Sequence, residues 1–331
     1  MKEIKTISCF GTSHTAGGGF EFESLTGFPY DNSERRYGEV LKEVYKEFPN
    51  PKTQFRYSWP GQLQELFLKN NLEVEVLNRA KQGYGNERVY RKVFETIDAP
   101  TFDKDTHLLL IEFSFIGRKE YFWNEINDYI ICNYSPEEAK DFKGNIVPIT
   151  SDVKNKKKKY TKMVGPINDQ IGYAHSWFYD DNSNVHEILD KQVPKIINPF
   201  VSKSLDWIEQ YKQLRKNITF FLSYLLFNKI NFLISFAEFD NSVLELDENI
   251  FNEIKKRKIY YGDTESWPEL MKRHQLTIND ETRGIVGDFH FGFYGNKLVS
   301  EYVFNHLSKM FGWNPIPMRI QEYIDKTKNI L

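Results

Sequence analysis

The chain has 331 residues, of which 40% are hydrophobic, and this length allows one large domain or two. Its formal net charge of -2 argues against a broad nucleic-acid interface, because nonspecific binders of nucleic acid carry an excess of basic residues. The two cysteines, Cys9 and Cys132, are too few for a disulfide framework, and no Cys/His spacing resembles a metal site. We therefore expect neither a disulfide-stapled protein nor a metal or nucleic-acid binder.

The most apolar stretch of the chain is too short to cross a membrane. Residues 218–239 are interrupted by Asn228, Lys229 and Asn231, so neither half approaches the roughly 20 residues that span a bilayer. No secretory signal is expected, because residues 1–5 lead directly into a strand-like run. These features predict a soluble protein without a membrane span.

The first third of the chain alternates between strand and helix patterns. The runs are a strand at residues 6–10, a helix at 63–70 after a start signal at 58–61, a strand at 72–77, a helix at 86–97 and a strand at 106–111. The last of these is continuously apolar, which is typical of a strand buried on both faces. Strands and helices at this spacing predict a parallel sheet with helices on both sides.

The rest of the chain is less regular. Residues 121–199 show few periodic runs. The basic run at 154–159 predicts a solvated loop, with contact to phosphate or an acidic glycan as the alternative. A helix, a strand and a closing helix are expected after it, at residues 203–226, 231–236 and 295–311. We expect residues 119–202 to form an insertion or lid within a single domain at residues 1–331. The predicted fold class is α/β, a three-layer α/β/α sandwich with a mostly parallel sheet and a large irregular insertion.

Ser13 stands where the first predicted strand meets a turn of small residues. A serine at the carboxyl edge of a parallel sheet can expose its hydroxyl, while the amides of the next turn point toward a developing negative charge. Serine needs a base to remove its proton, and the late Asp288 and His290 offer a carboxylate and an imidazole. An early serine followed by a late acid and histidine predicts an acyl-transfer triad. In it Ser13 attacks, His290 is the base and then the acid, and Asp288 orients His290.

Four short blocks carry a family resemblance. Residues 11–17 read Gly-Thr-Ser-His-Thr-Ala-Gly, residues 78–86 read Asn-Arg-Ala-Lys-Gln-Gly-Tyr-Gly-Asn, residues 112–115 follow the third strand, and Gly295 lies five residues after His290. In these blocks the chain resembles the SGNH (GDSL-like) hydrolase superfamily, and especially its divergent branch in phage and marine-microbe genomes. The resemblance implies a flavodoxin-like α/β/α sandwich and a serine esterase.

The resemblance also implies roles for individual residues. Ser13 matches the nucleophile, with Thr12 in place of the family's aspartate, and the amide of Gly83 matches a donor of the oxyanion hole. Asp288 lies two residues before His290, where the family's acid lies three before it. Asp263 and Asp280 are the alternative acids to Asp288. In the ordinary structural interpretation Ser13 caps a helix, and His290, Asp288 and Gly83 are plain loop residues.

The third block departs furthest from the family. Ser114 takes the place of an asparagine whose side chain donates to the oxyanion, and a hydroxyl reaches less far than an amide. Asn86 and Arg118 are alternative donors for the same role. Arg118, Tyr84 and His14 are the candidate substrate-binding residues.

The resemblance implies the removal of a small acyl group, such as acetyl, from a carbohydrate, with no cofactor. The expected partner is a small ester or acylated glycan, and a homo-oligomer or virion assembly is possible. Two alternative functions are open: an inactive SGNH-like protein that binds glycan or builds a virion, and an acyltransferase with the same Ser-His chemistry. The expected location is the cytoplasm or a virion.

Overall fold

The computed structural model describes the chain in separate ranges. The ranges are residues 3–17, 58–80, 85–113, 207–236, 252–253, 255–259, 270, 274 and 292–330, together with the backbone of five strands between residues 118 and 177. Ser13 is described by its backbone.

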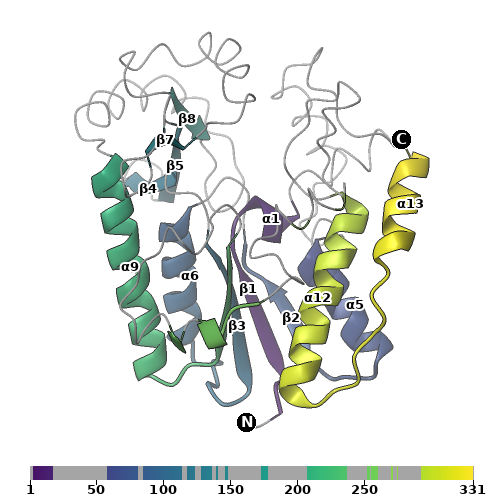
Figure 1. Cartoon of the computed structure of the whole chain (residues 1–331). Coiled ribbons are helices and arrows are strands. Elements are labelled where there is room, and N and C mark those ends of the chain that lie inside the picture. The colour runs from purple at the N-terminus through teal and green to yellow at the C-terminus, as the bar shows by residue number, and fades with distance from the viewer. Residues whose placement is uncertain are drawn as a thin grey trace.

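A parallel sheet forms the centre of the fold, with the strand order β2-β1-β3-β9 (Figure 1). Its strands are β1 (Thr6–Phe10), β2 (Glu75–Asn78), β3 (His107–Phe113) and β9 (Phe232–Phe236). In this register Cys9 of β1 lies between Asn78 of β2 and Leu110 of β3. Beyond β9 the sheet continues as an isolated parallel bridge between Ile234 and Lys258. The α/β class predicted from the sequence is confirmed.

Helices lie on both sides of this sheet (Figure 1). They are α5 (Trp59–Lys69) and α12 (Phe293–Phe311) on one side, and α6 (Asn86–Ile97) and α9 (Trp207–Phe227) on the other. Side chains alternate along a strand, so Leu108 and Leu110 of β3 face α5 and α12, while Leu109 and Ile111 face α6 and α9. Every residue of β3 is buried, as its continuous apolar sequence predicts.

The local sequence explains where α5 and α12 begin and end. Ser58 precedes α5, and its Oγ accepts a hydrogen bond from the Gly61 amide at 3.5 Å, while Pro60 lies in the first turn, where a missing N–H costs nothing. Gly312 ends α12 in the left-handed conformation at φ 73°, and the Trp313 amide bonds to the Ser308 carbonyl at 3.0 Å. These are common signals for the start and end of helices.

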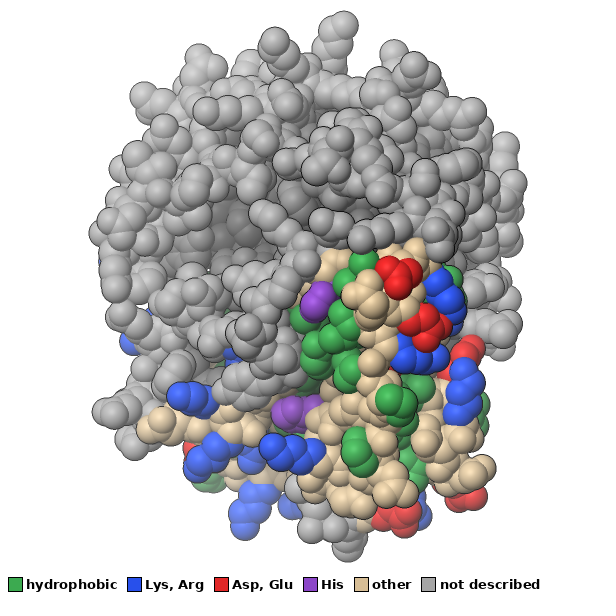
Figure 2. All heavy atoms as spheres, turned by 45° about the vertical axis from the view of Figure 1, so that its right-hand side comes forward, with side chains coloured by type: hydrophobic (Ala, Val, Ile, Leu, Met, Phe, Trp, Pro, Cys, Tyr) green, Lys and Arg blue, Asp and Glu red, His purple; other side chains and the backbone are tan. Residues whose placement is uncertain are grey.

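The described outer surface carries charges of both signs. Figure 2 shows acidic and basic side chains interspersed on the described part of one face. Two of the surface ion pairs are Lys69 with Glu65 at 3.5 Å and Lys326 with Glu322 at 2.5 Å. Among the described helices, none combines the length and the apolar character that a bilayer span requires.

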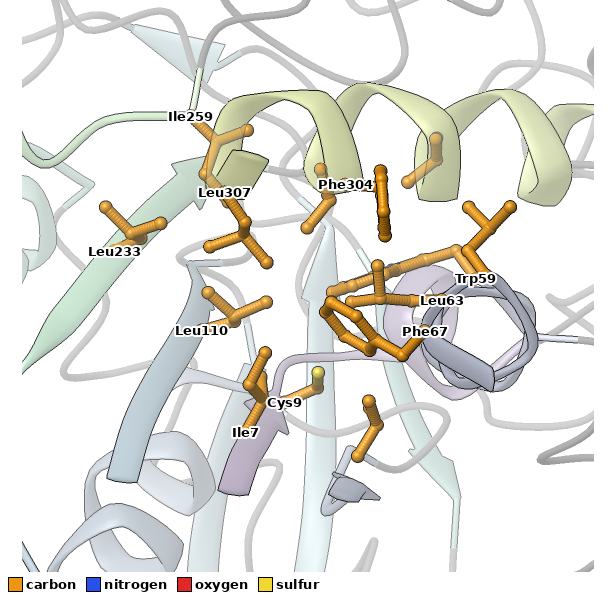
Figure 3. Close-up of a cluster of buried hydrophobic side chains, with 14 of the residues drawn as sticks. Ile7, Cys9, Trp59, Leu63, Phe67, Leu110, Leu233, Ile259, Phe304 and Leu307 are labelled. Carbon is orange, nitrogen blue, oxygen red and sulfur yellow. The ribbon is translucent and has the colours of Figure 1, made fainter. Parts of the chain in front are cut away.

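The hydrophobic core on the α5 side is built from large side chains of two helices. Figure 3 shows Trp59, Leu63 and Phe67 of α5, with Phe304 and Leu307 of α12, packed above the sheet. The Phe67 and Phe304 rings lie 5.5 Å apart at a tilted angle. Because α12 supplies much of this core, it holds the end of the chain against the first strand.

A closing helix, α13 (Ile320–Ile330), packs beside α12 (Figure 1). The Glu301 carboxylate of α12 is 1% exposed and accepts hydrogen bonds from Arg319 Nε at 2.7 Å and from the Tyr323 hydroxyl at 2.5 Å. The sequence analysis did not predict this helix. Its docking combines this buried carboxylate with apolar packing, because Tyr323, Ile320 and Ile324 lie against the core on the α5 side.

The segment expected to be irregular contains strands. They are β4 (Arg118–Trp123), β5 (Asp128–Ser135) and β8 (Tyr173–Trp177), paired antiparallel in the order β4-β5-β8, and the short pair β6 (Ala139–Lys140) and β7 (Ile146–Val147). The expectation of an irregular segment was therefore wrong at these strands. β4 reads Arg-Lys-Glu-Tyr-Phe-Trp, with its polar and aromatic residues in blocks, so it lacks the alternation that indicates a strand.

Candidate functional site

The predicted nucleophile lies at the point where the strand order of the sheet reverses. From β1 the chain goes to β2 on one side, while β3 and β9 lie on the other side. Open α/β sheets bind ligands outside the carboxyl ends of their strands at such a point. The first block begins at Gly11, directly after β1, and the third block includes the last residues of the neighbouring β3. The fold therefore brings these two blocks together.

The turn after β1 begins a short helix, α1 (Ser13–Ala16). The Ala16 amide donates to the Thr12 carbonyl at 2.8 Å, so Thr12 occupies the N-cap position and Ser13 is the first helical residue. This places Ser13 one residue beyond the cap position considered in the ordinary interpretation. Gly17 ends the block at φ 85°, a conformation that L side chains rarely adopt.

A buried carboxylate lies behind this turn. Glu112 of β3 is 1% exposed, and its Oε1 accepts hydrogen bonds from the amide and from Oγ1 of Thr12, each at 3.1 Å. Its Oε2 accepts a hydrogen bond from Thr15 Oγ1 at 2.8 Å. A Cβ at Gly11 would lie 2.8 Å from Glu112 Oε1, so only glycine fits this close approach. The sequence analysis missed this role, although an acidic residue in an apolar strand is a signal for it.

The second block contacts the first through Asn78. Its Nδ2 donates to the Thr15 carbonyl at 3.0 Å and lies 3.3 Å from Ser58 Oγ. Arg88 of α6, which follows residues 81–84 in the sequence, donates from Nη1 to the Arg79 carbonyl at 2.8 Å. The second block is thus held to the first turn and to α6 at the same edge of the sheet.

The start of α12 is joined to the same turn through Trp59. The Trp59 indole Nε1 donates to Thr15 Oγ1 at 3.3 Å, and its backbone amide donates to Asn296 Oδ1 at 2.9 Å. Asn296 Nδ2 in turn donates to the Gly292 carbonyl at 3.1 Å. Gly292 follows His290 by two residues. Buried hydrogen bonds therefore connect the first turn of α12 with the turn that carries Ser13.

The structure describes only some of the other predicted site residues. Gly83, Tyr84, Ser114, Asp288 and His290 lie outside the described residues, as do the alternative acids Asp263 and Asp280. Arg118 is described by its backbone, as the first residue of β4. Asn86 is the first residue of α6 and is buried, and His14 in α1 is buried as well. Within the described part of the chain, no group of three or more His, Cys, Asp or Glu residues could hold a metal ion.

A second serine and histidine pair lies lower in the sheet. Ser8 Oγ of β1 and His107 Nε2 of β3 are 2.9 Å apart. Ser8 is completely buried, so no substrate reaches its hydroxyl. The pKa of His107 is lowered to about 4, mainly by burial and also by the nearby Arg79, while Asp103 acts in the opposite direction. This pair is a packed element of the sheet.

The His107 imidazole predicts a loss of stability in mild acid. The unfolded chain binds a proton at this residue near pH 6.5 and the folded chain near pH 4, so stability is full above pH 6.5 and falls as the pH drops toward 4. We expect the free energy of unfolding in urea to fall by about 2 kcal/mol between pH 7 and pH 5 from this residue. The control is His107→Gln, which should lose less between these two values. An equal loss in both proteins would contradict the prediction.

Comparison of the chain with family models, with curated proteins and with solved structures finds no match.

Proposed function

We propose that this protein is a serine ester hydrolase of the SGNH type that removes small acyl groups, such as acetyl, from a carbohydrate. The observation that carries the proposal is the position of the turn with Ser13. It follows β1 at the carboxyl edge of the sheet, where the strand order reverses, and hydrogen bonds through Trp59 join it to the first turn of α12.

The connection to α12 supports the pairing of Ser13 with His290. Two residues of chain reach at most about 7 Å, and Gly292, two residues after His290, is held by Asn296. Asn296 is held in turn by Trp59, which contacts Thr15. Gly292, two residues after the predicted base, is thus joined by hydrogen bonds to the turn of the predicted nucleophile, which supports their pairing.

The strand order supports the fold that the proposal requires. Counted in chain order, the sheet reads 2-1-3-4, and the bridge at Lys258 adds a fifth position beyond β9. The order 2-1-3-4-5 is that of flavodoxin-like sheets. Under the proposal the helices on the two faces make a three-layer sandwich, and residues 119–202 are an insertion into it.

The proposed chemistry proceeds in two acyl-transfer steps. His290 removes the hydroxyl proton as Ser13 Oγ bonds to the ester carbonyl carbon, and it gives that proton to the departing alcohol oxygen. Water then attacks the acyl-enzyme, with His290 again as base, and releases the acid and free Ser13. Asp288 holds the imidazole in the required tautomer.

The oxyanion of each tetrahedral intermediate is proposed to bind the amides of Ser13 and Gly83, with a third donor from Asn86, Ser114 or Arg118. One such donor stabilises the transition state by about 3–4 kcal/mol. Asn86 begins α6, the helix that follows β2, so its position at the amino end of that helix suits the role.

The rim of the proposed site predicts a preference for short acyl groups. Tyr84 is aromatic and Arg118 is polar, and such groups can stack on a sugar and bind its hydroxyls but gain little from a long acyl tail. His14, predicted as a third member of this rim, is buried in α1 and is not part of the proposal. We expect turnover of aryl acetates and acetylated oligosaccharides, and poor turnover of acyl chains beyond about eight carbons, although each methylene would contribute about 0.8 kcal/mol in an apolar groove. The measurement is kcat/KM along a series of aryl esters of increasing acyl length.

The same assay separates the alternatives. Activity that rises steadily with chain length would contradict the proposed substrate class. A protein that binds glycan but neither hydrolyses any ester nor reacts with a fluorophosphonate would be the inactive relative, a function that the substitution of Ser114 for asparagine favours. Transfer of the acyl group to an added sugar acceptor would identify an acyltransferase.

A further inference from the structure

Three hydrogen bonds to the Glu112 carboxylate come from the turn that carries Ser13. Thr12 supplies its amide and its hydroxyl to one carboxylate oxygen, and Thr15 supplies its hydroxyl to the other. Thr12 precedes Ser13 and Thr15 follows it. The two oxygens of one rigid carboxylate therefore hold the chain on both sides of the proposed nucleophile.

The location of this carboxylate is energetically costly. Glu112 lies near the end of a strand whose other residues bury apolar side chains or a histidine, and a buried carboxylate is destabilising unless hydrogen bonds compensate it. An apolar residue at this position would fill the space at lower cost. Unlike an apolar side chain, the carboxylate can bind two separate points of the turn, Thr12 and Thr15.

Two further contacts make the arrangement specific. Gly11 leaves the space that the carboxylate occupies, because a Cβ there would lie 2.7 Å from Thr15 Oγ1 and 2.8 Å from Glu112 Oε1. Thr15 Oγ1 also accepts the indole N–H of Trp59, which connects to the first turn of α12. Glu112 thus lies at the centre of the contacts that relate the turn of Ser13 to β3 and to α12.

We propose that Glu112 is a positioning residue that fixes Ser13 relative to the oxyanion donors and to His290 by holding Thr12 and Thr15. This inference rests on the proposed function. A displacement of about 1 Å at a reacting group can lower a rate about 100-fold. We therefore expect Glu112 to affect the rate of acyl transfer rather than the binding of substrate.

The test compares variants that keep or remove the contacts. Glu112→Gln replaces the acceptor Oε2 with an amide NH2 group, a donor that faces the Thr15 hydroxyl. Thr15→Val removes this hydroxyl, and Thr15→Ser keeps it. We expect Glu112→Gln and Thr15→Val to lower kcat for an aryl acetate about 100-fold with little change in KM, and to slow labelling of Ser13 by a fluorophosphonate in parallel. Thr15→Ser should retain most of the wild-type kcat.

The matched control is Glu301→Gln, which alters a second carboxylate that is also 1% exposed and hydrogen-bonded, between α12 and α13. All variants are assayed at a temperature where urea unfolding shows them folded. If Glu112→Gln does not fold, the Thr15→Val and Thr15→Ser pair decides the test. Wild-type kcat in folded Glu112→Gln and Thr15→Val, or an equal loss in Glu301→Gln, would overturn the inference while leaving the esterase proposal intact. A wild-type protein that neither hydrolyses the ester nor labels at Ser13 would overturn both.

Discussion

Replacing Ser13 by alanine is expected to lower ester turnover by about a thousand-fold or more, because no other group can form the acyl-enzyme. His290→Ala should cost a similar factor, since an unactivated hydroxyl attacks poorly. The double variant should be little worse than either single variant, because members of a triad act as a unit. The measurement is kcat/KM for an aryl acetate, together with mapping of the residue that a fluorophosphonate modifies.

Ser8→Ala is the matched control for this prediction. It removes the hydroxyl of a serine in β1 that is paired with a histidine, His107, but that substrate cannot reach. Ser8→Ala should therefore keep its turnover even if it lowers stability. Normal turnover in Ser13→Ala, or fluorophosphonate labelling at another residue, would place the nucleophile elsewhere.

Replacing Glu301 by leucine is expected to lower the free energy of unfolding by about 3 kcal/mol. The carboxylate accepts hydrogen bonds from the Tyr323 hydroxyl and from Arg319, and its loss leaves the buried hydroxyl of Tyr323 without this acceptor. Leucine has a similar volume, so the effect comes from the lost contacts rather than from a cavity. Urea unfolding followed by circular dichroism measures it.

Tyr323→Phe completes a double-mutant cycle with Glu301→Leu. Because both changes remove the same hydrogen bond, the double variant should be more stable than the sum of the single effects predicts. Glu322→Gln, which breaks the exposed pair with Lys326 on α13, should leave the urea midpoint almost unchanged. A large loss in this control, or strict additivity in the cycle, would contradict the role of Glu301.

The regular part of the fold was predictable from local sequence. The helix predicted at residues 86–97 has the same bounds in the structure, because its apolar side chains repeat with helical period and Gly85 precedes it. The parallel sheet followed from strands and helices that alternate at short spacing. The helix α13 was missed although Ile320, Tyr323 and Ile324 have helical spacing, because the rest of the helix is mostly polar and its buried hydrogen bonds go to Glu301 of another helix.

The candidate site was predictable only in part. The position of Ser13 at the end of β1 followed from an apolar run that stops at a glycine. The contact of Glu112 with Thr12 and Thr15 depends on the pairing of β1 with β3, and a single sequence does not specify which side chains two strands bring together. The juxtaposition of His290 and Asp288 with Ser13 stays a prediction, since both lie outside the described residues.

The strand order also has a consequence for how the chain folds during synthesis. β3 pairs with β9, although residues 114–231 lie between them, and α12 covers the α5 face of β1 from the far end of the chain. Such a fold has a high contact order, so the entropy of closing long loops is lost before these contacts form, and folding is slow. A nascent chain that ends before α12 exposes the apolar face formed by Ile7, Leu110 and Phe67. It is prone to aggregation until α12 has left the ribosome and can cover this face.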